Sequence, residues 1–372
     1  MDHAPTQSLT STHNPNTSGR RQRILSGMRP TGKLHLGNYV GALANWVKLQ
    51  RQYDSYFFIA DWHALTSDYA DTSAVKQSSI EVMLDYLAAG LDPQTCTMFI
   101  QSHVPQHAEL HLLLSMITPL GWLERVPTYK EQQQNIRDKD LNTYGFLGYP
   151  LLQSADIMMY QADFVPVGED QVPHIEITRE IARRFNGFYP RVVKSADKDP
   201  QRSYVFPEPQ ALLTPSPKLP GTDGRKMSKS YGNSILMSDP EAIVRQKLKT
   251  MVTDPARVRR TDPGNPDVCP VGDVHKIFSS SDTLQKVYAG CRSAGIGCIE
   301  CKSWAADALV AVLNPMQERR RHYEQNPQEA WDLLEDGARR ASRTAEATME
   351  EVRVAMKMSK DYEAPAGQAA TK

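Results

Sequence analysis

Residues 23–38 read Arg23-Ile-Leu-Ser-Gly-Met-Arg-Pro-Thr-Gly-Lys-Leu-His-Leu-Gly-Asn38, and this stretch decides the fold that the sequence predicts. Its apolar beginning is typical of a short strand, which runs directly into a glycine-rich turn. Apolar residues recur at helical spacing from Gly37 onward, so a helix should begin there. A strand, a glycine-rich turn and a helix in this order form one unit of an α/β fold, and the amides that open such a helix attract anions.

Three later apolar runs predict further strands that are covered on both faces, as in a parallel sheet. These runs are Tyr56–Ala60, Thr97–Ile100 and Phe164–Val167. A helix is expected over Ser73–Ala89, where Gly90 should end it. Strands that alternate with helices favour a Rossmann-like, doubly wound parallel sheet. Ligands of such sheets bind beyond the carboxyl ends of the strands, so the loops that follow the strands should hold the functional site.

The length of 372 residues exceeds the usual size of a single core, so we expect two domains. After about residue 238 the pattern is helical, with helices expected at about 240–251, 273–290, 303–325 and 327–358. The sequence therefore predicts a Rossmann domain over 23–238, with a helical insertion at about 103–160, and an all-α C-terminal domain over 239–362. Residues 1–22 read as a disordered leader, and 363–372 as a loose tail.

The composition, with 40% hydrophobic and 23% charged residues, is that of an ordinary soluble protein. No apolar run approaches the ~20 residues of a membrane-spanning helix, so no membrane contact is expected. The formal net charge of zero gives no bulk attraction for DNA or RNA. RNA would have to use local basic patches, although each run can equally be a solvated helix face. The runs are Arg257, Arg259, Arg260, Arg319, Arg320, Arg321, Arg339, Arg340 and Arg343.

Residues 226–230 read Lys-Met-Ser-Lys-Ser and follow a Gly/Pro-rich loop at Leu219–Arg225. Lysine is rarely buried without a partner, so two ammonium groups on a loop favour a clamp for a polyphosphate over a core position. A solvated surface turn is the alternative. Upstream, Gly32 and Gly37 allow the backbone to approach a ligand closely, and His35 adds a donor. Neither a Walker A nor a GxGxxG motif occurs, so ATP would need this other kind of loop.

Two acidic segments are candidates for the substrate site. Asp156 lies in the nearly apolar stretch Tyr149–Tyr160, where an unpaired carboxylate would be costly. It should therefore accept a hydrogen bond, either from a neighbouring Tyr or Arg or from a substrate. Residues 168–171, Gly-Glu-Asp-Gln, follow a predicted strand and could cap a helix or hold a ribose or an ammonium group. The segment Asp61–Thr66 ends the second strand, and its His63 could be structural or functional.

Four of the five cysteines lie in one segment, with the spacing C-x21-C-x6-C-x2-C, while Cys96 precedes the third strand. Because no signal peptide is recognised, we expect these thiols to be in a reducing compartment and the protein to be cytoplasmic. Such a set can bind zinc or a [4Fe–4S] cluster, or consist of incidental thiols. Its members are Cys269, Cys291, Cys298 and Cys301.

These motifs together resemble one known family. Pro30–Asn38 resembles the HIGH signature of class I aminoacyl-tRNA synthetases, and residues 226–230 are identical to their KMSKS signature. The segments Ala60–Thr66, Tyr149–Ile157 and Val167–Gln171 are similar to the tryptophanyl branch of bacterial enzymes. The resemblance spans about residues 23 to 360.

The resemblance implies specific roles for residues of this chain. The catalytic residues would be His35, Lys226 and Lys229. ATP would be contacted by Arg29, Pro30, Thr31, Gly37, Asn38, Gly168, Glu169, Asp170, Leu219, Lys226, Met227, Ser228, Lys229 and Ser230. Tryptophan would be held by Leu25, Gly27, His63, Gln153, Asp156, Val165, Val167 and Gln171, with Asp156 accepting the indole N–H. Arg29 and Gln153 depart from the pattern, since many members have Gln and some have Met at these positions.

The resemblance also implies a reaction and partners. Tryptophan and ATP with Mg²⁺ would give tryptophanyl-adenylate and pyrophosphate, and the amino acid would pass to the 2′-OH at the 3′ end of tRNA(Trp). A homodimer with tRNA bridging the subunits is implied. The cysteine spacing resembles, with one residue fewer in the first gap, the cluster site of a minority of bacterial tryptophanyl enzymes. A tyrosyl-specific synthetase is the nearest alternative, and an inactive RNA-binding paralogue is another, although the intact His35, Lys226 and Lys229 argue against it.

Overall fold

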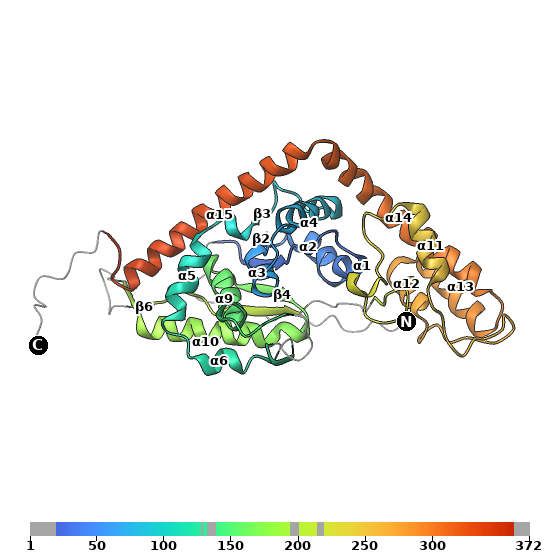
Figure 1. Cartoon of the computed structure of the whole chain (residues 1–372), viewed down its shortest axis with the longest axis horizontal. Helices are drawn as coiled ribbons and strands as arrows, with labels where there is room; N and C mark the ends of the chain where they lie inside the picture. Colours follow the sequence, from blue (N-terminus) through green and yellow to red (C-terminus); the bar gives the residue numbers. More distant parts are fainter. Residues whose placement is uncertain (1–19, 128, 132–138, 194–200, 214–218, 361–372) are drawn as a thin grey trace, which may run out of the picture.

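A computed structural model describes residues 20–127, 129–131, 139–193, 201–213 and 219–360. At its centre lies a five-stranded parallel sheet with the strand order β3-β2-β1-β4-β7 (Figure 1). The strands are β1 (Arg23–Met28), β2 (Asp54–Ile59), β3 (Thr97–Ile100), β4 (Phe164–Val167) and β7 (Gln210–Leu213). From β1 the chain builds β2 and β3 on one side and β4 and β7 on the other. The order therefore reverses between β1 and β4, which makes the space beyond their carboxyl ends the switch point where ligands bind.

The four predicted strands are all present, and the predicted fold class is confirmed. Three strands were not predicted: β7 and the small antiparallel pair β5 (Arg191–Val193) and β6 (Gln201–Ser203). The strand β7 pairs with β4 alone, and its side chains are only partly buried or exposed. An edge strand of this kind needs no continuous apolar run, so the sequence carries little signal for it.

The helices of the first two thirds connect these strands and cover the sheet. Asp61–Thr66, which was expected to end the second strand, instead forms the first turns of α3, a difference that places His63 on a helix. The α-helices are α1 (Leu36–Asn38), α2 (Ala44–Leu49), α3 (Asp61–Asp68), α4 (Val75–Ala89), α5 (Gln106–Ser115), α6 (Leu120–Glu124), α8 (Tyr144–Leu147), α9 (Tyr149–Met159) and α10 (Val172–Phe188). A π-helical turn spans Tyr39–Leu43, and 3₁₀ turns span Gln101–His103, Glu169–Gln171 and Lys229–Tyr231.

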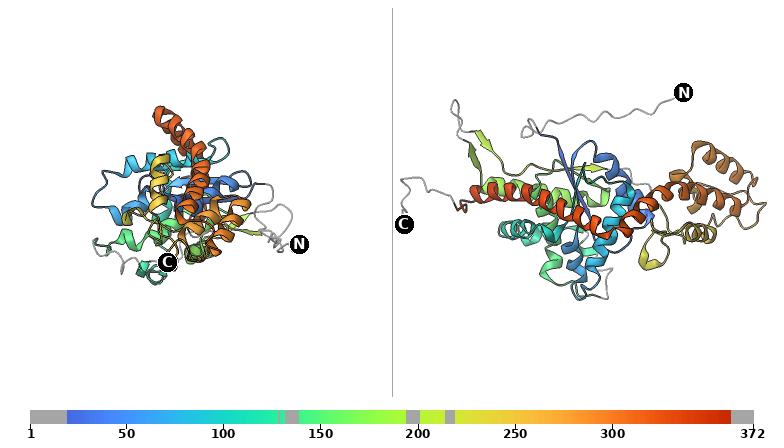
Figure 2. Two further views of the ribbon diagram at one scale, coloured as in Figure 1. Left: turned by 90° about the vertical axis from the view of Figure 1, so that its right-hand side faces the viewer. Right: turned by 90° about the horizontal axis from the view of Figure 1, so that it is seen from above.

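After residue 240 the described residues are mostly helical, as predicted. Where one helix was expected over 273–290 there are two, because Ser280 accepts a hydrogen bond from the Thr283 amide and caps a new helix. The helices are α11 (Glu241–Thr250), α12 (Pro270–Phe278), α13 (Ser281–Arg292), α14 (Cys298–Gln325) and α15 (Pro327–Ala355). Helices α11 to α13 gather at one end of the molecule, beyond the sheet (Figure 2).

The two long C-terminal helices pack on the Rossmann core. Helix α15 runs beside β3 (Figure 1), and Gly337 permits this approach, because a Cβ atom there would lie 1.7 Å from the carbonyl oxygen of Met98. Leu309 of α14 and Leu334 of α15 share a hydrophobic cluster with Ile24 of β1. The domain boundaries at 23–238 and 239–362 therefore stay a prediction. The predicted tail and nearly all of the predicted leader lie outside the described residues.

No helix among the described residues combines the length and the apolar character that crossing a membrane requires.

Candidate active site

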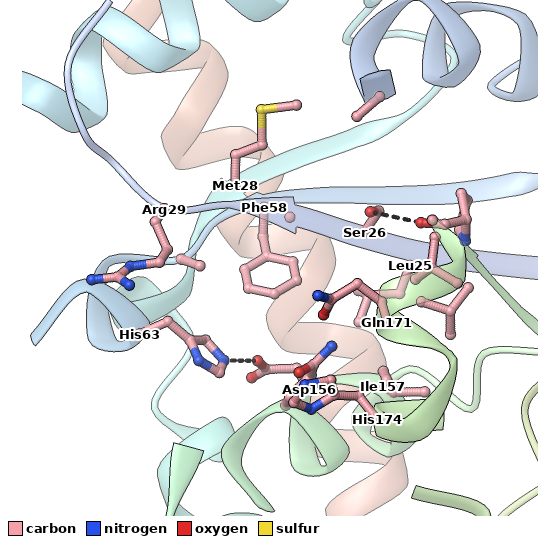
Figure 3. Close-up of a pocket in the computed structure, with 18 of the residues that line it drawn as sticks. Leu25, Ser26, Met28, Arg29, Phe58, His63, Asp156, Ile157, Gln171 and His174 are labelled. Carbon is pink, nitrogen blue, oxygen red and sulfur yellow. Dashed lines mark hydrogen bonds and ion pairs between the residues drawn. The ribbon is translucent and has the colours of Figure 1, made fainter. Parts of the chain in front are cut away.

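A cavity of about 380 Å³ lies at the switch point between β1 and β4 (Figure 3). Its volume is in the range typical of small-molecule sites. Its wall includes all eight residues that the resemblance assigns to tryptophan: Leu25, Gly27, His63, Gln153, Asp156, Val165, Val167 and Gln171. Residues from four distant segments thus surround one space, although their roles there remain a proposal.

Several other side chains line this cavity and were not singled out in the sequence. They include Met28, Phe58, Thr66, Tyr149 and His174. A Cβ atom on Gly27 would lie 2.7 Å from the Phe58 ring, so the glycine makes room for that ring. Phe58 belongs to the apolar run Tyr56–Ala60, in which the sequence cannot distinguish a side chain that faces a cavity from one that faces the core.

The carboxylate of Asp156 is the most deeply buried charge in the cavity wall, with the residue 1% exposed. Its Oδ1 accepts hydrogen bonds from Gln101 Nε2 at 2.8 Å and from His107 Nδ1 at 2.6 Å, and its Oδ2 pairs with His63 Nε2 at 2.7 Å. Burial would raise the pKa of Asp156, but the hydrogen bonds from His107 and His63 outweigh it and hold the pKa below its ordinary value. The site therefore contains a buried, ionised acceptor.

The partners of Asp156 differ from those expected, since they are two histidines and a glutamine rather than a neighbouring Tyr or Arg. The expectation that the carboxylate has a partner was right, and the expectation of a neighbouring Tyr or Arg was wrong. A donor on the substrate, the second possibility, stays a prediction. His107 is itself held in place, because its Nε2 pairs with the Tyr160 hydroxyl at 2.8 Å. His63, whose side chain is 12% exposed, is the partner that lines the cavity (Figure 3).

His35 lies at the start of α1 in a reciprocal cap. Its Nδ1 accepts from the Asn38 amide at 3.3 Å, and its own amide donates to Asn38 Oδ1 at 3.1 Å. Burial, followed by the nearby charge of Lys229, lowers the pKa of His35 to about 4, so the ring is neutral. With Nδ1 accepting, the proton is on Nε2, which is a donor. A Cβ atom on Gly37 would lie 2.9 Å from this imidazole, so only glycine leaves the ring in place.

We expect His35 to stay uncharged in the ligand-free protein at every pH above about 5, because burial and Lys229 both disfavour the imidazolium. An NMR titration of the ring carbons, assigned with a His35→Asn variant, should show an inflection near the pKa of about 4. An inflection near the ordinary value of 6.5 would contradict the role of a neutral donor.

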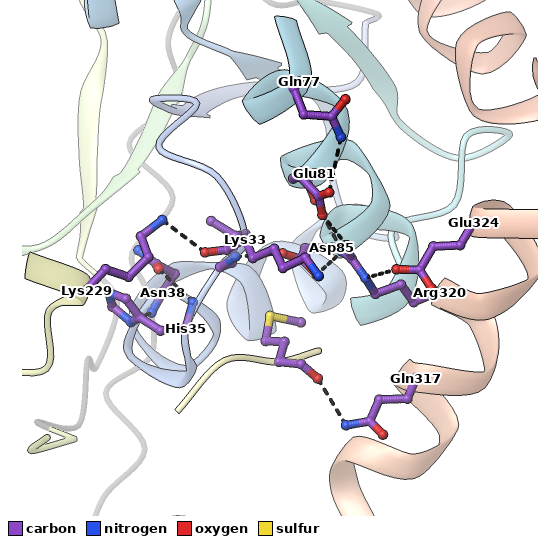
Figure 4. Close-up of polar contacts among 12 residues, drawn as sticks. Lys33, His35, Asn38, Gln77, Glu81, Asp85, Lys229, Gln317, Arg320 and Glu324 are labelled. Carbon is purple, nitrogen blue, oxygen red and sulfur yellow. Dashed lines mark hydrogen bonds and ion pairs between the residues drawn. The ribbon is translucent and has the colours of Figure 1, made fainter. Parts of the chain in front are cut away.

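The two signature segments meet (Figure 4). Lys229 Nζ donates to Thr31 Oγ1 at 3.1 Å and to the carbonyl oxygen of Lys33 at 3.0 Å, and it also contacts the carbonyl oxygen of Thr31. Just beyond the signature, Ile235 accepts from the Leu36 amide at 2.9 Å. The ammonium group of Lys229 therefore lies over the turn that leads to His35, as the clamp hypothesis requires.

The other residues expected to contact ATP fall into separate places. Arg29 and Gly168 line the cavity, but the Arg29 guanidinium points to α3, where it pairs with Asp68 at 3.0 Å. Lys226 is exposed and Met227 is buried. Pro30 and Thr31 lie in the turn before α1, and Gly37 and Asn38 lie in α1 itself. Glu169 and Asp170 are exposed in the turn after β4, and Leu219 is buried.

The four C-terminal cysteines lie near one another but are not arranged as a metal site. Burial, followed by the nearby thiols of Cys269, Cys291 and Cys298, raises the pKa of Cys301 to about 12. The effect of these neighbours on the pKa places the four side chains near one another. Across the residues that the structure describes, no group of three or more His, Cys, Asp or Glu side chains is arranged to hold a metal ion. The predicted iron–sulfur or zinc centre is therefore not supported.

One of the arginines expected in a basic patch is not at the surface. Arg320 is 3% exposed and is paired with carboxylates, while its neighbours Arg319 and Arg321 are exposed. The run cannot act as three solvated cations.

A parallel Rossmann-type sheet with these two paired signature segments defines a class I aminoacyl-tRNA synthetase. Residues 17–314 match the model of the family described as tRNA synthetases class I (W and Y), and the chain belongs to that family.

Similar proteins with a known name or structure agree with this assignment. The tryptophan–tRNA ligase of Ralstonia nicotianae is 49% identical, over 90% of this chain and 98% of its own length. That of Thermotoga maritima is 52% identical, over 90% of this chain and 99% of its own length. The crystal structure of tryptophanyl-tRNA synthetase from Campylobacter jejuni complexed with ADP and tryptophan has a TM-score of 0.79 at 30% identity, and the match covers 90% of this chain and all of that one. The expected family and enzyme class, an aminoacyl-tRNA ligase, are confirmed.

Proposed function

We propose that the protein is a tryptophan–tRNA ligase that activates L-tryptophan with ATP and transfers it to tRNA(Trp). The observation that carries this proposal is the cavity between β1 and β4, where a buried carboxylate lies among apolar side chains. The same wall includes Arg29, which leads directly into the turn that Lys229 contacts. The named relatives and the complex of the Campylobacter jejuni enzyme with ADP and tryptophan support it.

In the cavity, the side chains of Leu25, Val165 and Val167 would enclose the indole ring. The indole N–H would donate to Oδ2 of Asp156, which has His63 as its present partner. A carboxylate oxygen has two lone pairs, so it can accept from both donors. Gln153 and Gln171, on opposite elements of the wall, would orient the amino acid with its carboxylate toward the signature segments.

The first step would be an in-line displacement. A carboxylate oxygen of tryptophan attacks the α-phosphorus of ATP, the bond from that phosphorus to the oxygen bridging to the β-phosphate breaks, and pyrophosphate leaves with the electron pair. Such a transfer needs positioning and charge stabilisation rather than covalent help from the protein. The Nε2–H of His35 and the amides near Gly37 would donate to the α-phosphate.

The leaving pyrophosphate would be stabilised by lysines. Lys226 and Lys229 would bind the β- and γ-phosphates of the substrate MgATP, where charge accumulates as the bond breaks. The present acceptors of Lys229 are neutral oxygens of Thr31 and Lys33. Phosphate oxygens are stronger acceptors for an ammonium group, so the lysine would exchange these partners for the substrate.

The second step would transfer tryptophan from the adenylate to the 2′-OH of the terminal adenosine, with release of AMP. We therefore expect no charging of tRNA(Trp) that ends in 2′-deoxyadenosine, and normal charging of tRNA(Trp) that ends in 3′-deoxyadenosine. Aminoacylation with labelled tryptophan measures both, and unmodified tRNA(Trp) is the control. Charging of the 2′-deoxy form would contradict the proposed site of transfer.

A second copy of the chain is the partner we propose for the exposed apolar side chains of α5 and α6. Leu112 is 54% exposed and Met116 69% exposed, and their spacing of four residues places them on one helix face. Leu120 adds to the same region with 61% exposure. Exposed apolar groups of this kind mark interaction sites. Sedimentation should give twice the chain mass, and a particle of one chain would contradict the dimer.

A cytoplasmic location, where tRNA is charged, follows from the proposed activity.

A further inference from the structure

The C-terminal helix α14 extends an arginine into the Rossmann core (Figure 4). The side chain of Arg320 is 4% exposed and contacts three carboxylates. Its Nη1 is 2.5 Å from Asp85 Oδ1, its Nε donates to Glu324 Oε1 at 2.8 Å, and its Nη2 pairs with Glu81. The guanidinium is thus fixed on every side, with Asp85 and Glu81 on α4 and Glu324 on its own helix.

Asp85 connects Arg320 to the turn before α1. The residue is fully buried, and while its Oδ1 faces Arg320, its Oδ2 accepts from the Leu34 amide at 2.6 Å. Leu34 directly precedes His35, and the carbonyl oxygen before Leu34, that of Lys33, accepts from Lys229. A single carboxylate therefore connects α14 to the backbone between the proposed donor His35 and the contact of the clamp lysine.

A second contact from the same face of α14 reaches the segment that follows the Lys226–Ser230 signature. Gln317, three residues before Arg320, donates from Nε2 to the carbonyl oxygen of Asp239 at 2.8 Å and to that of Met237 at 3.2 Å. The Met237 amide in turn donates to the carbonyl oxygen of Leu34 at 3.0 Å. The amide of Leu34 is therefore bonded to Asp85, and its carbonyl oxygen to Met237; side chains of α14 contact both of these residues.

The chemistry of the ion pair between Arg320 and Asp85 indicates that it positions the backbone rather than only stabilising the fold. A buried ion pair is expensive to desolvate, and apolar residues of similar volume often stabilise a protein as well or better. What an apolar pair cannot provide is an acceptor for the Leu34 amide at a fixed point. Burial raises the pKa of Asp85 to about 6; Arg320 opposes this rise and holds the carboxylate in the orientation that this amide needs.

We propose that Arg320 and Asp85 are positioning residues for the activation step, which set the backbone at Leu34 and thereby the place of His35 and of the partners of Lys229. The inference rests on the proposed function.

The test compares two variants with a matched control. Asp85→Ala removes the acceptor of the Leu34 amide while Arg320 keeps Glu81 and Glu324 as partners. Arg320→Met combined with Asp85→Asn removes the support from α14 without leaving an unpaired buried charge. The control, Arg319→Gln, removes a guanidinium of the same helix that donates to the Ala88 carbonyl oxygen of α4 at 2.8 Å and does not reach Leu34.

Tryptophan-dependent pyrophosphate exchange is measured for each variant and divided by the number of active sites found by adenylate titration. We expect kcat to fall roughly 10- to 100-fold in both variants, because a small displacement of positioning groups has effects of that order. The KM for tryptophan should stay within about twofold, and the control should match the parent enzyme. A lower melting temperature with an unchanged kcat per active site would overturn the proposal, since it would show a structural role alone.

A readout that does not depend on activity separates this proposal from the proposed function. Amide hydrogen exchange at Leu34 should be slow in the parent protein and in Arg319→Gln, and faster in both test variants. If none of the amino acids supports pyrophosphate exchange by the parent protein, the proposed function fails. The amide hydrogen exchange at Leu34 would still test the connection from α14. Equal protection of Leu34 in all four proteins would overturn the connection itself.

Discussion

Replacing Lys229 by alanine should slow tryptophan activation at least about tenfold, and as much as about 10³-fold if the lysine acts mainly in the transition state. The reason is its position: its ammonium group lies over the turn before His35, bonded to Thr31 and Lys33, where the leaving pyrophosphate would be bound. Lys229 is not among the described residues that line the cavity proposed for the indole ring. Rapid-quench measurement of adenylate formation, together with calorimetric titration of tryptophan, checks both halves of this expectation.

The matched control is Arg225→Ala, which removes a cation from the same loop. The exposed Arg225 guanidinium pairs with Asp223 at 2.7 Å and does not contact the turn before His35, so its loss should change activation by less than about twofold. Comparable losses in both variants would indicate a general effect of loop charge. An equal loss of tryptophan affinity in Lys229→Ala would count against the clamp.

Replacing Asp156 by asparagine or alanine should lower kcat/KM for tryptophan by roughly 10²-fold or more, and should reduce the preference for tryptophan over phenylalanine by a similar factor. In the parent protein a buried, ionised acceptor would be left with one unmet hydrogen bond whenever phenylalanine is bound, which penalises the wrong substrate. Asparagine presents only one acceptor oxygen to His63, Gln101 and His107, so it cannot reproduce the site. Pyrophosphate exchange at varied tryptophan, phenylalanine and ATP measures the effect.

A buried carboxylate away from the cavity provides the control for this variant. Asp163, whose side chain is 4% exposed, pairs with Arg20 at 3.0 Å and accepts from the Arg23 amide at 2.7 Å, at the opposite end of β1. Asp163→Asn should reduce stability without changing the ratio of tryptophan to phenylalanine. Selectivity that survives in Asp156→Asn, or an equal loss of ATP affinity there, would reject the proposed contact with the indole N–H.

The parts of the site that lie in loops after strands could be predicted from the sequence. Gly37, His35 and the Lys226–Ser230 segment stand out because glycine, histidine and paired lysines in a loop have few structural uses. Asp156 could be identified because a charge in an apolar helix requires a partner. The resemblance supplied the remaining residues of the cavity wall, and the geometry brings all eight to one space.

The residues that support this site could not be predicted in the same way. His107 on α5 and Gln101 in the 3₁₀ turn after β3 lie in segments with no unusual composition. Their contacts with Asp156 arise only when both elements pack against α9. Arg320 was interpreted as part of a surface patch, because a run of three arginines is usually solvated, and burial of the middle one depends on the distant Asp85. Pairing across more than 200 residues leaves no local pattern in a single sequence.

The central claim is that the cavity between β1 and β4 joins tryptophan to ATP, and amino-acid-dependent pyrophosphate exchange tests it most directly. The purified protein, given MgATP, labelled pyrophosphate and each of the 20 amino acids in turn, should exchange label strongly with tryptophan and only weakly with tyrosine or phenylalanine. Strong exchange with tyrosine instead would assign the cavity to the tyrosyl-specific alternative. The absence of exchange with every amino acid would contradict the account as a whole.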